Sequence, residues 1–163
     1  MFFQLFSYLQ FLLKSTDEHG VHSPFVFDFV TKGLYQKKIK SINFEEYSVL
    51  KSLSKKQKKL LSKILIYFKI DKISFDSSSF NEKPENYKLL YINNIESVKN
   101  INFSKLSSKH IILIDGIYQS KKSEQEWQNI IKKNNLTVSI NLFYFGLLFF
   151  RKEQAKEDFR IRV

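Results

Sequence analysis

The residues best suited to chemistry near the start of the chain are two histidines and a serine, His19, His22 and Ser23. Imidazoles at this spacing can ligate a metal ion, but such a site needs further ligands. The chain has no cysteine and only one other histidine, His110, so we predict no metal site. A Ser–His–Asp hydrolase site using Asp28 would need a G-x-S-x-G turn, which the sequence lacks. We therefore interpret this segment as a loop that ends in a helix cap.

A second group of candidates follows apolar runs in the carboxyl-terminal half. Asp115 comes after the four apolar residues 111–114, and Asn93 follows the apolar run 89–92. Burial at the end of a strand raises the pKa of a carboxyl group and suits it to act as a base, but an aspartate here can equally cap the loop after its strand. The amide of Asn93 takes up no proton at neutral pH. One carboxylate and one amide do not make a catalytic site.

The first part of the chain, residues 1–69, is predicted to be helical. Apolar residues recur there at helical spacing in four segments. These predicted helices cover residues 2–14, 24–34, 44–53 and 54–68. Ser23 is a suitable N-cap for the second helix, and Pro24 suits its first position.

After the helical part, the pattern changes to short apolar runs separated by polar turns. The predicted strands cover residues 72–76, 88–94, 110–116 and two runs within 136–152. A helix over 123–135, with Ser123 and Glu126 at capping-box spacing, follows the third strand. This order predicts a mixed sheet. We expect one α/β domain over 1–163, with its sheet in 70–163.

The composition is that of a folded and strongly basic protein. The net charge is +11, which suits nucleic acid or an anionic surface. Arginine is the preferred residue for phosphate and base contacts, but nearly all of the positive charge is lysine spread along the chain. We interpret the lysines as solvated charge and expect no nucleic-acid partner. The densest run is Lys55, Lys56, Lys58, Lys59 and Lys63, and the only arginines are Arg151, Arg160 and Arg162.

The amino-terminal segment 2–14 is apolar, with residues recurring at helical spacing. It is too short to span a bilayer, and its polar side carries glutamine and serine rather than lysine. We expect this helix to pack onto the domain rather than to contact a membrane. The absence of cysteine fits a reducing compartment, so we expect a cytoplasmic location.

Three stretches resemble a known family: KSTDEHGVHSPFVFDFVTK, HIILIDGIYQSKKSEQEWQNIIKKNNLTVSI and FGLLFFRKEQAKEDFRIRV. They are similar to stretches of bacterial class I S-adenosylmethionine-dependent methyltransferases. The resemblance implies an α/β fold with N-terminal helices and a Rossmann-like sheet whose second and third strands are deleted. We expect a truncated, mixed sheet of about five strands whose last strand is antiparallel.

The deletion removes the parts that bind the cofactor in that family. In place of an acidic-x-Gly loop, the first strand is followed by a degenerate loop of Asp76, Ser77, Ser78 and Ser79. The acid that binds the ribose hydroxyls has no counterpart. The resemblance implies a vestigial pocket, and its candidate residues are Asn93, Asp115, His22 and Tyr118.

We therefore expect a degenerate methyltransferase-like protein that binds no S-adenosylmethionine, catalyses nothing and acts through protein contacts. Two alternatives remain open: an active methyltransferase with an atypical cofactor pocket, and a basic nucleic-acid-binding module. Loss of the neighbouring strands would leave the strand at 73–76 at the edge of the sheet. We expect a second copy, or an intact relative, to associate through this edge.

Overall fold

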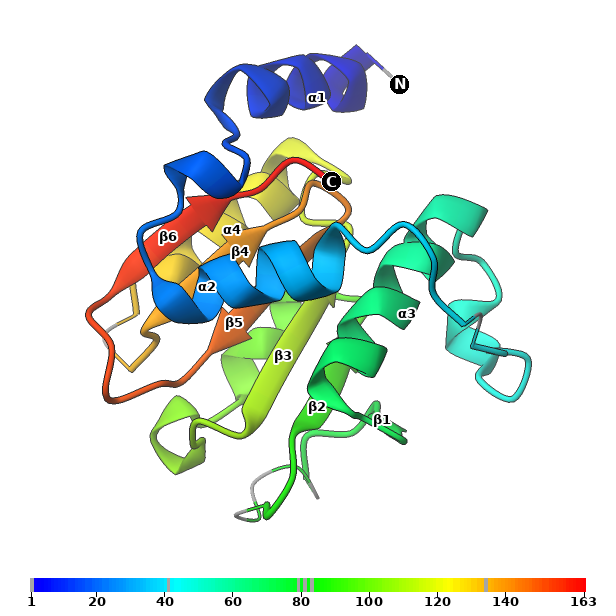
Figure 1. Cartoon of the computed structure of the whole chain (residues 1–163), viewed down its shortest axis with the longest axis vertical. Coiled ribbons are helices and arrows are strands. Elements are labelled where there is room, and N and C mark those ends of the chain that lie inside the picture. Colours follow the sequence, from blue (N-terminus) through cyan, green and yellow to red (C-terminus); the bar gives the residue numbers. More distant parts are fainter. Residues whose placement is uncertain (1, 41, 79, 81, 83, 134) are drawn as a thin grey trace.

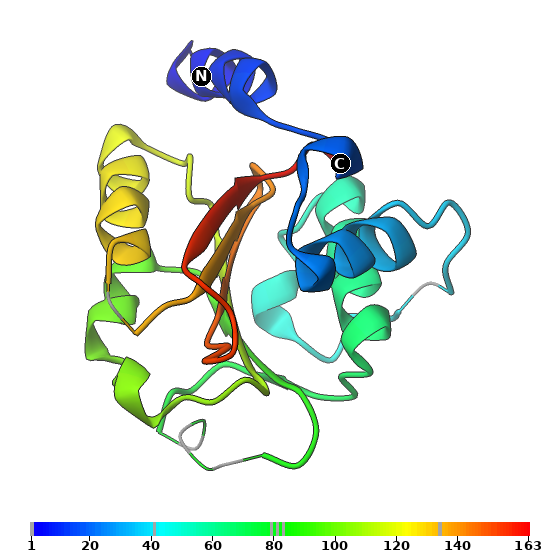
Figure 2. The ribbon, with the colours of Figure 1, turned by 60° about the vertical axis from the view of Figure 1, so that its left-hand side comes forward.

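The computed structural model describes residues 2–40, 42–78, 80, 82, 84–133 and 135–163. They form a sheet between two helical layers, as the view along the sheet in Figure 2 shows. The strands are β1 (Ile73–Ser74), β2 (Lys88–Ile92), β3 (His110–Asp115), β4 (Val138–Asn141), β5 (Phe145–Phe149) and β6 (Glu157–Arg160). Their order is β1-β2-β3-β5-β4-β6 (Figure 1).

The sheet is mixed, as predicted. β5 runs antiparallel to both of its neighbours, β3 and β4, whereas the other neighbouring strands pair in parallel. The last strand was expected to be antiparallel; this holds for β5, the last of the five predicted strands, but the last strand of the chain, β6, pairs in parallel with β4. The prediction of about five strands missed the sixth, β6, because its sequence EDFR is polar and lies at the edge of the sheet.

Among the described residues, four α-helices and five 3₁₀ or π segments complete the fold. The α-helices are α1 (Phe2–Lys14), α2 (Pro24–Asp28), α3 (Lys55–Phe68) and α4 (Lys121–Ile131). The π-helix η2 (Phe29–Leu34) continues α2, and the 3₁₀ turns are η1 (Glu18–Gly20), η3 (Ser48–Leu50), η4 (Ile95–Asn100) and η5 (Phe103–Lys105). The helix predicted over 44–53 was wrong, because only the short turn η3 forms there.

Helix caps explain where several of these elements begin. Ser23 accepts a hydrogen bond from the Val26 amide at 3.4 Å and caps α2 as predicted. The capping box predicted at Ser123 and Glu126 was wrong, because the N-cap of α4 is Ser120, three residues before Ser123. The Ser120 side chain accepts a hydrogen bond from the Ser123 amide at 3.0 Å.

The sheet separates two hydrophobic cores. α2, η2 and α3 pack on one face, and α4, η4 and η5 pack on the other. On the α4 side, Trp127 is 1% exposed and lies directly against β5 at Gly146. A Cβ atom at Gly146 would lie 2.4 Å from Trp127 Cζ3, so this close approach requires glycine.

The interpretation of the lysine run as solvated charge was wrong for one lysine of α3, Lys63. The Lys63 ammonium donates a hydrogen bond to the Leu34 carbonyl oxygen at the end of η2. Burial lowers the pKa of this lysine below its ordinary value. Lys63 therefore joins α3 to the end of the preceding helix.

Helix α1 packs onto the domain along one side only. Phe11 is buried, and its ring lies 5.6 Å from that of Phe143. The Tyr8 ring meets the Phe143 ring edge-on, with the ring centres 4.8 Å apart. The opposite side of the helix is exposed and carries Phe2, Leu5, Phe6, Leu9 and Leu13. The helix therefore packs on the domain through Phe11 and Tyr8, whereas the apolar stripe from which this packing was expected is largely exposed.

No helix in the described part of the chain is long and apolar enough to cross a lipid bilayer.

Candidate functional site

A cavity of about 460 Å³ lies at the carboxyl edge of β2 and β3. The strand ends, the loops that follow them and the adjoining helices supply its walls. Its lining residues are Gln4, Ser52, Gln57, Asn93, Asp115, Gly116, Tyr118, Gln119, Phe143 and Tyr144. The structure thus brings together three of the four residues predicted for a vestigial pocket: Asn93, Asp115 and Tyr118.

Asp115 is the charged centre of this cavity. Its carboxylate accepts a hydrogen bond from the Tyr91 hydroxyl at 2.7 Å and one from the Gln57 amide nitrogen at 3.4 Å. Burial raises the pKa of Asp115, and these two hydrogen bonds to the carboxylate oppose the rise. Burial and the neighbouring carboxylate raise the pKa of Tyr91, so its hydroxyl stays protonated and donates.

A second set of contacts holds the aromatic wall. The Asn141 side chain donates a hydrogen bond to the Tyr118 hydroxyl at 2.8 Å and accepts one from the Phe143 amide at 2.9 Å. The rings of Tyr118 and Phe143 stack with centroids 5.1 Å apart. Phe143 has a φ of 68°, which is rare for a residue with a side chain. These bonds fix the turn between β4 and β5 against the loop after β3.

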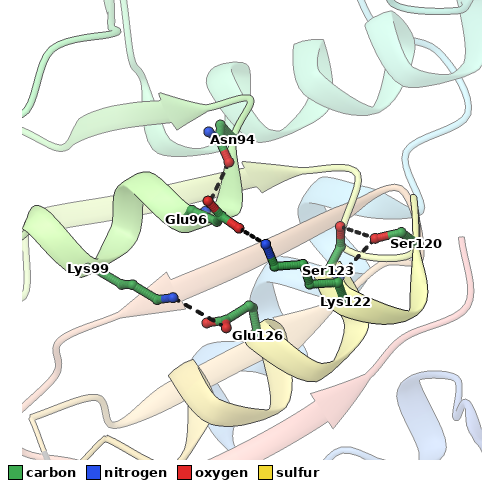
Figure 3. A network of polar contacts seen from close by, with 7 residues as sticks. All are labelled: Asn94, Glu96, Lys99, Ser120, Lys122, Ser123 and Glu126. Carbon is green, nitrogen blue, oxygen red and sulfur yellow. Dashed lines mark hydrogen bonds and ion pairs between the residues drawn. The ribbon is translucent and has the colours of Figure 1, made fainter.

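The loops that border the cavity are braced by a polar network between η4 and α4 (Figure 3). Asn94 caps η4 by accepting a hydrogen bond from the Glu96 amide at 3.1 Å. Glu96 pairs with Lys122 of α4, and Lys99 pairs with Glu126 at 3.3 Å. The network therefore joins the segment that follows Asn93 to the helix that follows the Asp115 loop.

The fourth predicted pocket residue, His22, lies elsewhere. It is exposed in the loop before α2 and does not line the cavity. The neighbouring Ser23 accepts a hydrogen bond at 2.6 Å from Gln154, which lies beyond β5. The Arg151 guanidinium lies 4.2 Å from the centre of the Phe25 ring. Two of the stretches that carry the family resemblance therefore contact each other in the structure, away from the cavity.

The loop predicted to be a degenerate cofactor loop follows β1. The Asp76 carboxylate accepts hydrogen bonds from the amide and the hydroxyl of Ser78, and these bonds lower its pKa. Ser77 lies within this turn, and Ser79 lies outside the described residues. Side chains, rather than a glycine backbone, thus close the turn, and none of its described residues lines the cavity.

Three structurally important polar residues were not predicted as site residues from the sequence. The sequence indicates only that Tyr91 is a core residue, although its hydroxyl reaches Asp115 on the next strand. Gln57 caps α3, and its side chain also reaches Asp115. His110 is fully buried; its Nδ1 accepts from the Ser107 amide at 2.9 Å and its Nε2 donates to the Phe80 carbonyl at 2.8 Å. No sequence signal distinguishes these roles from ordinary core or helix positions.

Comparison with known proteins found no matching family profile, no matching curated protein and no matching solved structure. Among the described residues, no group of three or more His, Cys, Asp or Glu side chains is arranged to hold a metal ion. The description of the site therefore depends on its own geometry: one half-buried carboxylate, four amide side chains and an aromatic wall.

Proposed function

We propose that this protein is a reduced, non-catalytic relative of class I methyltransferases that acts through contacts with another protein chain. The observation that carries the proposal is the position of β1. This strand is two residues long and forms the edge of the sheet, next to β2. In the methyltransferases that the sequence resembles, the strands that complete the cofactor site lie outside the first strand.

The turn after β1 supports the same proposal. A cofactor's ribose approaches the backbone closely at such a turn, which requires glycine. Here the side chains of Asp76 and Ser78 bond to each other and occupy the turn. The strand order agrees with the resemblance too: β2 and β3 correspond to the family's fourth and fifth strands, and the antiparallel strand lies beside the fifth.

Isothermal titration with S-adenosylhomocysteine tests the loss of cofactor binding. We expect no saturable heat up to about 1 mM ligand, which corresponds to a binding free energy weaker than about 4 kcal/mol. An intact class I methyltransferase titrated with the same stock serves as the positive control. A micromolar dissociation constant would refute the proposal in favour of an active enzyme with an atypical cofactor pocket.

The partner we propose is a second copy of the chain, or an intact relative, bound along the β1 edge. Among the described residues, no strand pairs with the outer side of β1. Phe75 beside it is 38% exposed, and its ring centre lies 5.4 Å from that of Tyr47 and 5.8 Å from that of Tyr91. An exposed strand edge with an apolar neighbour is a template for pairing with another chain.

Light scattering coupled to size-exclusion chromatography tests this association. We expect wild type to form dimers, and both Ser74→Pro and Phe75→Glu to shift it toward monomer. Proline removes a backbone donor from the edge strand, and glutamate places a charge on its apolar neighbour. Asp71→Asn, an exposed substitution before β1, is the control and should dimerise like wild type. A wild-type protein that is monomeric at high concentration contradicts the proposed contact.

A further inference from the structure

The cavity at the carboxyl edge has an unusual charge for this chain. The chain carries 27 lysines and arginines and a net charge of +11, yet none of those that the structure describes lines the cavity. Asp115 is the only lining residue with a side chain that is charged at neutral pH. The other polar groups are hydroxyls and the amides of Gln4, Gln57, Asn93 and Gln119. A basic protein thus keeps one cavity free of lining cations and gives it a negative centre.

The aromatic wall adds a second preference of the same sign. Tyr118, Phe143 and Tyr144 also line the cavity, and aromatic ring faces attract cations. The Tyr144 ring already makes such a contact, since the Lys56 ammonium lies 5.2 Å from its centroid. Lys56 itself is not among the residues that line the cavity.

From these features, the geometry points to a binding site for a small organic ammonium ion, with the ammonium on Asp115 and an apolar part against the Tyr118 and Phe143 rings. Each carboxylate oxygen accepts one hydrogen bond from the protein, from Tyr91 or from Gln57, and keeps a further lone pair for a ligand N–H. The amide oxygens of the wall can accept the remaining N–H groups. A volume of about 460 Å³ suits a ligand of this size.

Taking a carboxylate out of water disfavours its charged form, and burial raises the pKa of Asp115 accordingly. A bound ammonium would stabilise the charged form. An anionic ligand would be repelled by the same group, and a neutral alcohol could donate one hydrogen bond to the carboxylate but would lack the attraction between opposite charges.

The test uses the full chain and two probes that differ in one polar group, which is charged in one probe and neutral in the other. Phenethylamine carries an ammonium at neutral pH, and 2-phenylethanol replaces it by a hydroxyl group. We expect saturable binding of the amine, observed by protein NMR, with a dissociation constant of about 1 mM or less, and at least tenfold weaker binding of the alcohol, a difference of about 1.4 kcal/mol. Equal affinity for the two probes, or no saturable binding of the amine, overturns the inference.

Two variants and a change of pH test whether the amine binds at Asp115. Asp115→Asn should weaken amine binding about tenfold while keeping an acceptor for the Tyr91 hydroxyl. Asp71→Asn removes the same charge from an exposed position and should bind the amine like wild type. In wild type, the affinity should fall as the pH is lowered through the raised pKa of Asp115, because protonation of this carboxylate removes the negative charge. Unchanged binding in Asp115→Asn, or no loss at low pH, contradicts the site.

The inference is independent of the proposed function. The S-adenosylhomocysteine titration reports on the methyltransferase cofactor, whereas the comparison of amine with alcohol reports on the charge selectivity of the cavity. Either result can fail without the other.

Discussion

Helix α1 allows a sharp prediction, because two phenylalanines of one helix lie in opposite environments. Phe11 is 3% exposed against the cavity wall, whereas Phe6 is 61% exposed on the outer side. Phe11→Ala removes a buried ring whose loss typically costs about 3–5 kcal/mol. α1 is held by few buried side chains, so we expect this loss to undock the helix rather than to unfold the sheet.

The size of the effect follows from these values. A loss of about 3 kcal/mol shifts the docking equilibrium of α1 by about 150-fold. Lys14 ends the helix, so trypsin cleavage after it reports on undocking. We expect Phe11→Ala to speed this cleavage about 100-fold, with an unchanged circular dichroism signal from the sheet. Mass spectrometry identifies the product that begins at Ser15.

Phe6→Ala is the matched control, and it should change the cleavage rate less than twofold, because exposed substitutions act within about 0.5 kcal/mol. A Phe6→Ala variant that is cleaved as fast as Phe11→Ala would refute the argument. That result would mean that the outer side of α1 is also covered in solution.

Three further predictions follow from buried contacts and from the charge of the chain. Burial lowers the pKa of His110 below its ordinary 6.5, so the unfolded state takes up a proton at a higher pH than the folded state does. The free energy of unfolding of wild type should therefore decrease as the pH falls through 6.5. Urea denaturation at pH 7.5 and 5.5 should show this loss, and His110→Gln should abolish it. Gly146→Ala forces a methyl group against Trp127 and should cost about 1–3 kcal/mol in thermal unfolding, part of which Trp127→Leu should restore. Binding to DNA should be weak, sequence-independent and lost between low and physiological salt; submicromolar binding that survives physiological salt would contradict the solvated-lysine interpretation.

The sequence predicted those parts of the fold whose signals are local. The apolar runs of β2 and β3 and the cap at Ser23 before α2 were all recognisable, because burial and capping leave short-range patterns. β6 was missed because its edge position does not require apolar residues. The start of α4 was misread because Ser120 and Ser123 are both suitable caps, and only the hydrogen bond from one to the other identifies the first.

The cavity was predictable to the extent that strand ends are predictable. Asn93 and Asp115 end neighbouring parallel strands, so any sheet that pairs β2 with β3 brings them to one edge. Tyr91 was not predictable as a partner of Asp115, because alternation along β2 indicates only that the residue is buried. Gln4 and Gln57 reach the cavity from helices whose positions depend on tertiary packing.

The two edges of the sheet differ in a way that bears on the proposed partner. At the β6 edge, Thr16 forms a bridge with Ile161, donating from its amide to the Arg160 carbonyl at 2.8 Å and accepting from the Arg162 amide at 3.1 Å. Thr16 thus pairs with the carboxyl-terminal end of this edge. No described segment forms such a bridge at β1, where the Tyr47 ring packs against Phe75 and its hydroxyl reaches the Ile73 backbone. Because open strand edges are the part of a sheet that pairs with other chains, the difference favours β1 as the place of contact.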